Sequence, residues 1–308
     1  MNTRTDATPD SVGWQFAAPA HISPARRLGW SVRRELWENR SIYLAPPAVA
    51  AVFLVGFFIW LIRLPERMGA ALALSPTQQL EAIQQPYLMV ALMLMFIQLL
   101  VAVFYCLDAL YGERRDRSIL FWKSLPVSDL TTVLSKASIP VLILPLLTCA
   151  ITVATQFIML VVSSAVLAGS GMSAATLWTH VPFFKTSLIN LFHLVAIHGF
   201  WYGPFYGWLL LVSVWSRRAP FLWATLPPVA IGVFEKIAFN TSHFAEMVQH
   251  RFVGGPEPTA PADRMTMDML APHSLGQFLT SPGLWIGLAV TAGFLFAAVQ
   301  LRRYRGPI

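Results

Sequence analysis

The sequence predicts an all-α integral membrane protein with six transmembrane helices, both termini in the cytoplasm, and an amphipathic interfacial helix before the first span. Of its 308 residues, 56% are hydrophobic and 12% are charged, whereas a soluble domain carries about a quarter charged residues. The apolar residues gather in six stretches, each long enough to cross a bilayer as a helix. The basic residues gather on one side of these stretches.

The six spans are expected at residues 42–62, 87–110, 137–167, 187–215, 220–239 and 282–301. The fourth is interrupted by Gly199, Gly203-Pro204 and Gly207, a pattern that permits either close helix packing or a bend. Residues 1–40 form a cytoplasmic tail with an amphipathic connecting helix, and residues 41–308 form the transmembrane domain. Within that domain, 112–136 is a cytoplasmic segment and 240–281 a long extracytoplasmic loop.

The orientation follows from the lysines and arginines. Of the 22, 16 precede the first span, follow the second or fourth span, or lie in the C-terminal tail. Cytoplasmic loops carry the excess of Lys and Arg, so this side is the cytoplasm. Residues 1–40 contain no short apolar core, so we expect no cleaved signal peptide and a multi-pass protein of a bacterial-type inner membrane.

The segment before the first span reads as a helix lying in the membrane interface. Ser23-Pro24 is a typical helix start. Leu28, Val32 and Leu36 recur on one side of the predicted helix, and Trp30 and Trp37 share another side with nearby arginines. Tryptophans at headgroup level with arginines toward phosphates are typical of interfacial helices. A basic segment that simply precedes the first span is the alternative.

The loop after the second span, residues 111–136, carries the strongest functional signal. It reads YGERRDRSILFWKSLPVSDLTTVLSK, with charges first, an apolar aromatic centre next, and Pro126 before a new helix start at Ser128. Such an element suits a docking surface, where apolar side chains fill a groove and charges set the register. Aromatic residues resting among lipid headgroups would give the same pattern, and the residues alone leave both readings open.

The stretch ERRDRSILFWKSLPVSDLTTVLSK, between the second and third of six spans, resembles permeases of the ABC-2 type transporter family. The likeness is carried by Glu113, Arg114, Asp116, Ser118, Phe121, Lys123, Ser124, Leu125, Pro126, Ser128 and Lys136. The resemblance implies a coupling helix that docks on a separate ATPase. The expected docking residues are Glu113, Arg114, Asp116, Arg117, Phe121, Trp122, Lys123, Leu125 and Pro126.

The resemblance also implies an assembly, usually an exporter, of two permease subunits and two ATPase subunits. The second permease would be another copy of this chain or a related one, and ATP and magnesium would bind the ATPase. The loop 240–281 departs from the simplest members by its length. Because it is polar and rich in Pro and Gly, no re-entrant helix is carried over to it.

The absent motifs agree with this interpretation. The sequence contains no G-x-x-x-x-G-K-[ST], so it has no P-loop to cradle ATP phosphates. It offers no catalytic, cofactor-binding or metal motif, and its two cysteines, Cys106 and Cys149, both lie in spans. The net charge of +7 gathers at span ends, which favours anionic lipid over nucleic acid as a partner.

Polar residues inside the spans are functional candidates because they are costly there. Thr148, Thr152 and Thr155 share one face of the third span, and Asn190 and His193 lie in the fourth. These five residues would line a pathway or join helices. His193 and His198 are roughly 140° apart on a helix, which is poor geometry for one metal. Asp108 is expected to pair with an arginine of the adjoining loop.

Three other classes of function remain open to the sequence. An ion-gradient-driven secondary transporter would favour convergent charges and inverted repeats, and neither is evident. A membrane-embedded enzyme would use Asn190, His193, His198 and Glu235 as its polar centre. A non-transporting membrane anchor or assembly protein would bind partners without substrate-dependent ATP turnover.

Overall fold

The computed structural model describes residues 23–124, 127–253, 275–306 and 308, and every regular element in these ranges is helical. In chain order the elements are α1 (Pro24–Glu38), α2 (Ser41–Leu61), α3 (Leu64–Leu72), α4 (Pro76–Ala109), α5 (Tyr111–Arg115), α6 (Ile119–Ser124), α7 (Asp129–Ser138), η1 (Ile139–Ile143), α8 (Leu144–Gly169), α9 (Ala175–His180), α10 (Phe183–Phe192), η2 (His193–Trp201), α11 (Gly203–Trp215), α12 (Pro220–Phe239), α13 (His243–Val253), α14 (Leu275–Thr280) and α15 (Pro282–Tyr304). The two elements labelled η are π-helical.

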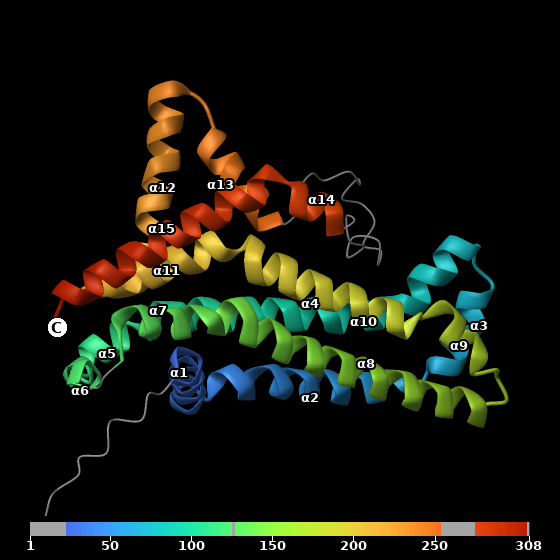
Figure 1. The fold of residues 1–308 in the computed structure, drawn as a ribbon. Helices are drawn as coiled ribbons and strands as arrows, with labels where there is room; N and C mark the ends of the chain where they lie inside the picture. The colour runs from blue at the N-terminus through green and yellow to red at the C-terminus, as the bar shows by residue number, and fades with distance from the viewer. Residues whose placement is uncertain (1–22, 125–126, 254–274, 307) are drawn as a thin grey trace, which may run out of the picture.

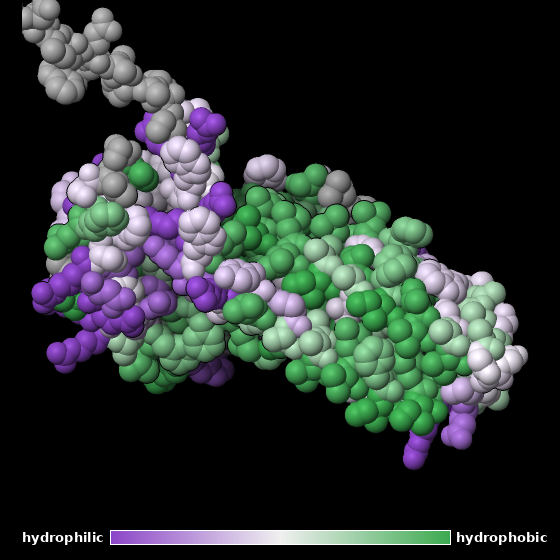
Figure 2. Space-filling view, turned by 90° about the horizontal axis from the view of Figure 1, so that it is seen from below, coloured by the Kyte–Doolittle hydropathy of each residue, from purple (hydrophilic) through white to green (hydrophobic). Residues whose placement is uncertain are grey.

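Within the described ranges, six helical segments are long and apolar enough to cross a membrane, as the composition predicts. They are Ser41–Leu61, Pro76–Arg115, Asp129–Gly169, Ala175–Trp201, Pro220–Phe239 and Pro282–Tyr304. Figure 2 shows a broad belt of hydrophobic side chains over the middle of the molecule, with hydrophilic side chains gathered at the end that carries α1, α5 and α6. The chain is therefore a multi-pass membrane protein by length and composition of its helices.

The second span begins earlier than its expected first residue, 87. The sequence predicts a short loop at 64–86 in which Ser75-Pro76-Thr77 could start a small helix; α3 occupies the first part, and the helix that starts at Pro76 is α4 itself, which runs through Pro86. Hydropathy misses this start because the added turns are rich in Gln. Their amides are bonded instead: Gln79 donates to the carbonyl of Leu72 at 2.7 Å, and Gln84 to that of His180 at 2.7 Å.

The fourth span is divided in two. α10 and η2 end at Trp201, and α11 begins at Gly203 with a proline in its first turn. The glycines left two readings open, close packing or a bend, and close packing accounts for Gly199 and Gly203. An added Cβ on Gly199 would lie 2.5 Å from the carbonyl oxygen of Val141 in η1, and one on Gly203 would lie 2.8 Å from Thr291 Oγ1 in α15. The break itself falls at Tyr202.

The fifth span matches its predicted range of 220–239, but the segment after it is not only a loop. α13 and α14 form within 240–281, and residues 254–274 lie outside the described ranges. The Glu235 carboxylate of α12 accepts hydrogen bonds from the backbone amides of His243 and Phe244, at 2.8 and 2.9 Å, at the start of α13. Arg251 of α13 then donates to the carbonyls of Trp201 and Gly283. Figure 1 shows α12 rising away from the other helices and α13 returning toward α15.

The arginine-rich first helix and the arginine-rich last turn of α15 lie at the same end of the molecule. In Figure 1, α1 is seen nearly end-on beside the first turn of α2, with α5, α6 and the C-terminus nearby. We call this region, formed by α1, α5, α6, α7 and the last turn of α15, the basic end. α1 starts as predicted, with the Ser23 hydroxyl accepting a hydrogen bond from the Arg26 amide at 3.4 Å.

Candidate functional site

The basic end contains a group of charged side chains that pair with one another inside the protein. They are Arg34 and Glu35 from α1, Glu113 from α5, Asp129 and Lys136 from α7, and Arg302 from α15. We call these six residues the buried charge cluster. Four segments far apart in the sequence therefore meet through ionic contacts rather than through apolar packing alone.

Glu35 and Lys136 form the most deeply buried pair. The side chains of Glu35 and Lys136 are 0% and 2% exposed, and Glu35 Oε2 lies 2.9 Å from Lys136 Nζ. The same oxygen accepts a hydrogen bond of 3.0 Å from the hydroxyl of Tyr105 in α4. The other Glu35 oxygen lies 2.5 Å from Arg34. Glu35 therefore ties α1 to both α4 and α7.

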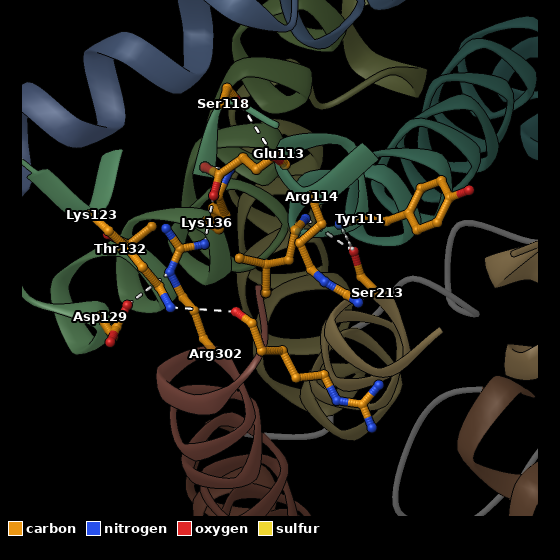
Figure 3. Close-up of polar contacts among 12 residues, drawn as sticks. Tyr111, Glu113, Arg114, Ser118, Lys123, Asp129, Thr132, Lys136, Ser213 and Arg302 are labelled. Atoms are coloured by element: carbon orange, nitrogen blue, oxygen red, sulfur yellow. Dashed lines mark hydrogen bonds and ion pairs between the residues drawn. The ribbon is translucent and has the colours of Figure 1, made fainter. Parts of the chain in front are cut away.

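Glu113 joins α5 to three other helices, α1, α7 and α15. Its Oε1 lies 3.1 Å from Lys136 Nζ and 3.4 Å from Arg34, and its Oε2 lies 2.5 Å from Arg302. Arg302 also donates through Nε to Asp129 at 3.0 Å. Figure 3 shows Arg302 reaching from α15 toward Asp129 and Glu113, with Lys136 against Glu113.

The cluster is balanced, with three acidic and three basic side chains. A buried charge without a partner is costly, so each member depends on the others for its compensation. Arg34 illustrates the balance: burial opposes its charge, but the attraction of the neighbouring carboxylates, led by that of Glu35, raises the pKa of its guanidinium above the ordinary value. Such a network specifies one arrangement of its helices, because any sliding would separate several pairs at once.

A second set of contacts holds the other side of α5. The Arg114 guanidinium donates to the carbonyls of Val214, Ser216 and Gly306. It thereby satisfies orphan carbonyls at the end of α11, the usual need of a helix C-terminus. The Ser213 hydroxyl accepts hydrogen bonds from the amides of Leu110 and Tyr111, at 3.0 and 2.8 Å (Figure 3).

Beyond these anchors, α6 presents apolar side chains to the surroundings. Leu120 and Phe121 are each 59% exposed, whereas Ile119 is buried beneath them. Trp122 is half-buried, with the Arg34 guanidinium 4.0 Å from its ring centroid. Lys123 donates to the carbonyls of Arg303 and Arg305 at 3.4 Å. The exposed pair, Leu120 and Phe121, is called the α6 apolar tip.

The expected docking residues fall into four groups, one of which is Trp122 alone, half-buried against Arg34. Asp116, Arg117, Phe121 and Lys123 are exposed on the surface of the segment. Glu113 and Arg114 are buried and bind neighbouring helices, so their side chains support the segment from below. Leu125 and Pro126 lie outside the described residues. Asp108 lies 3.9 Å from Arg115, which confirms the predicted pairing with the adjoining loop.

Sequence reasoning missed most of the cluster. Arg302 was counted only toward orientation, and Asp129 and Glu35 were given no role. One signal was available for Glu35: it follows Leu28 by seven residues and Val32 by three, hence it lies on the apolar face of the predicted helix. A carboxylate on that face needs a buried cation, which the sequence alone does not locate.

Of the polar residues inside the spans, Asn190 joins two helices, whereas Thr152 and Thr155 bond within their own helix. Thr148, Thr152 and Thr155 are buried, and the hydroxyls of the last two donate to carbonyls of their own helix, at 2.8 and 2.7 Å. Asn190 of α10 donates to Gln156 of α8 at 3.4 Å, and Gln156 donates to the Tyr87 carbonyl of α4 at 2.9 Å. These bonds favour the helix-packing reading over a pathway.

His193 and His198 lie together in η2, with ring centroids 5.8 Å apart. Within the described ranges, no group of three or more His, Cys, Asp or Glu side chains is placed to hold a metal ion. His193 therefore has a ring neighbour here, but no ligand set around it.

No family model, curated protein or solved structure matches this chain.

Proposed function

We propose that this chain is the permease subunit of an ABC-2 type transporter, forming the membrane pathway for export driven by a separate ATPase. The observation that carries the proposal is the α6 apolar tip: two large apolar side chains exposed on a charged, helical segment between two spans. The resemblance of residues 113–136 to that family supports the same role. The chain itself has no P-loop, so a partner would bind ATP and magnesium.

The support beneath the tip suits a coupling element. Glu113 and Arg114 follow each other in α5, and one binds α1, α7 and α15 while the other binds the end of α11. A displacement of α6 by a docked ATPase would therefore act on several spans at once. Exposed apolar side chains supply the contact area of such an interface, and the charges of Asp116 and Arg117 would set its register.

The orientation belongs to the same proposal. We place the basic end and both termini in the cytoplasm of a bacterial-type inner membrane. α1 would lie in the interface, since Trp30 and Trp37 are 56% and 65% exposed on its outer side, and Arg33 lies 4.8 Å from the Trp37 ring.

The exposure of α12 supports a second permease subunit in the proposed assembly. Ala224 is the one residue that is buried on this otherwise apolar helix. A helix that is hydrophobic all round and uncovered in the single chain must meet lipid or another protein. We propose a second permease subunit, either a copy of this chain or a relative, with one ATPase for each permease.

Affinity purification of the tagged chain from its native membranes in mild detergent tests the proposal. Mass spectrometry of the eluate should find a stoichiometric partner that carries a P-loop. If no such ATPase appears, even after cross-linking before solubilisation, the coupling-segment assignment loses its basis. Gradient-driven transport by the chain alone would then point to a secondary transporter.

Charge introduced at the α6 apolar tip should break this association. Leu120→Glu with Phe121→Glu is expected to reduce recovery of the ATPase at least tenfold, because the partner's groove would have to desolvate two carboxylates. Leu72→Glu in α3 is the matched control, since Leu72 is 40% exposed at the other end of α2. Undiminished recovery with the double variant would contradict the docking role.

A further inference from the structure

A cavity of about 730 Å³ opens between α2, α3, α4 and α8, toward the end of the molecule opposite the basic end (Figure 1). Its lining is mainly apolar, with Phe53, Phe57 and Trp60 from α2, Met68 and Leu74 around α3, and Ile83 and Met89 from α4. The volume lies within the range of about 300–1,000 Å³ that is usual for small-molecule sites. None of these lining residues belongs to the coupling segment.

The position of the cavity determines what can enter it. Gly56 lines it about 8 Å along α2 from the end of that helix at Leu61, and Phe53 about 12 Å, at 1.5 Å per residue. The cavity therefore reaches well into an apolar span and would lie at hydrocarbon depth. In a membrane the surrounding medium there is lipid, so an apolar hollow that opens outward is filled by acyl chains.

The rim carries a cation without an acidic partner. Arg67 of α3 lines the cavity, is exposed, and lies 5.2 Å from the ring centroid of Trp60. Among the described residues, neither Glu66 nor Glu81 forms an ion pair with it. A guanidinium and a tryptophan at the end of a span are typical of the headgroup level, where phosphate is the available anion.

We propose that this cavity binds one acyl chain of an anionic phospholipid, with the lipid phosphate at Arg67. The acyl chain passes between α2 and α4. Gly56 leaves room for it, because a Cβ at this position would meet no atom within 4 Å. Tyr87 and Ser163, whose hydroxyl oxygens lie 3.4 Å apart, line the buried side. The site is independent of the docking role and requires no ATPase.

Photo-crosslinking locates the lipid. The purified chain is reconstituted in phosphatidylcholine liposomes that contain a phosphatidylglycerol with a diazirine near the middle of one acyl chain, and labelled peptides are mapped by mass spectrometry. Peptides containing Phe53 to Trp60 or Met89 should be labelled several-fold more than those from the exposed face of α15, which carries Trp285, Ile286 and Phe296. Equal labelling of the two surfaces would mean ordinary lipid contact and would overturn the proposal.

Two variants separate the parts of the site. Gly56→Phe fills the cavity and should abolish the excess labelling, whereas Val52→Phe should not, because Val52 is 68% exposed on the same helix outside the cavity. Arg67→Gln should remove the preference for phosphatidylglycerol over a phosphatidylcholine probe. Excess labelling that persists in Gly56→Phe contradicts the acyl-chain assignment, and an unchanged preference in Arg67→Gln contradicts the phosphate assignment.

A competition experiment on the unaltered chain makes the result independent of variant folding. Unlabelled phosphatidylglycerol should suppress labelling of the cavity peptides at a lower mole fraction than labelling of α15. Parallel suppression at both places would also overturn the proposal.

Discussion

Glu35 is the residue whose environment differs most from what its type suggests. Carboxylates are almost never fully buried unless they are paired, and this one is fully buried with Lys136, Tyr105 and Arg34 as partners. Replacing such a pair by apolar residues is often neutral, but removing one partner strands the other charge. The stabilising effect of Glu35 therefore depends on Lys136, and substitutions at both positions can measure this dependence.

Glu35→Gln should lower the free energy of unfolding by about 3–5 kcal/mol, because Lys136 then keeps only Glu113 as a buried counter-charge. A loss of that size corresponds to a fall in melting temperature on the order of 10 °C for a chain of this length. Thermal melting in detergent, followed by size-exclusion chromatography, measures it. Glu38→Gln is the control: its side chain is 43% exposed, so about 1 kcal/mol or less is expected.

The same experiment with a second substitution tests whether the two charges act as a pair. Combining Glu35→Gln with Lys136→Met should cost less than the sum of the two single variants, because neither buried charge is then left alone. Additive losses would show that Glu35 acts through other contacts.

At this scale the sequence predicted residue types better than positions. Four charged residues of α5 and the turn after it were expected on one docking surface, but Glu113 and Arg114 are buried whereas Asp116 and Arg117 are exposed. Charge pattern alone cannot separate these cases, because burial depends on where the remote cation of Arg302 and the carbonyls after α11 lie.

Among the elements, the two π-helical segments pack closely against each other at Gly199. η1 contains Pro140, and η2 contains Gly199, which faces the Val141 carbonyl. A π-helical turn leaves backbone carbonyls off the regular α-helical ladder and is often found at functional positions. The absence of a side chain at Gly199 is what lets the backbones approach.

Gly199→Ala should destabilise the protein by about 1–3 kcal/mol, since the added methyl group would lie 2.5 Å from a backbone oxygen and force the segments apart. Gly293→Ala in α15 is a matched control, because no atom lies within 4 Å of its added Cβ, and alanine favours a helix. Melting temperatures of the two variants, compared with the parent, provide the measurement. A parent-like Gly199→Ala would contradict the close crossing.

The elements were predictable where hydropathy and helix signals agree. α12 begins at Pro220 and ends at Phe239 as expected, and the Ser23 cap of α1 is confirmed. The predictions were wrong in starting the second span at residue 87 and in treating 240–281 as a loop throughout. The polar turns of α4 are stabilised by Gln79 and Gln84, and the start of α13 by Glu235, through tertiary hydrogen bonds that a hydropathy window does not register.

The whole molecule has its charges segregated along its length. Figure 1 places α1, α6 and the C-terminus together at one end, and α3 and α9 at the other. The basic end holds the cluster and the α6 apolar tip, and the far end holds the cavity rim at Arg67. If the basic end faces the cytoplasm, the charge cluster and the α6 apolar tip lie on the cytoplasmic side, and Arg67 lies on the opposite side of the membrane.

Single cysteines test this orientation. Cys106 and Cys149 are buried, so the parent chain should react little with a membrane-impermeant maleimide. Glu66→Cys in α3 should react in intact cells whose outer membrane is opened. Asp116→Cys and Tyr304→Cys, at exposed positions of the basic end, should react only after the inner membrane is permeabilised. Reaction of Asp116→Cys from outside would show that the chain has the opposite orientation. A cytoplasmic ATPase could then not reach the α6 apolar tip.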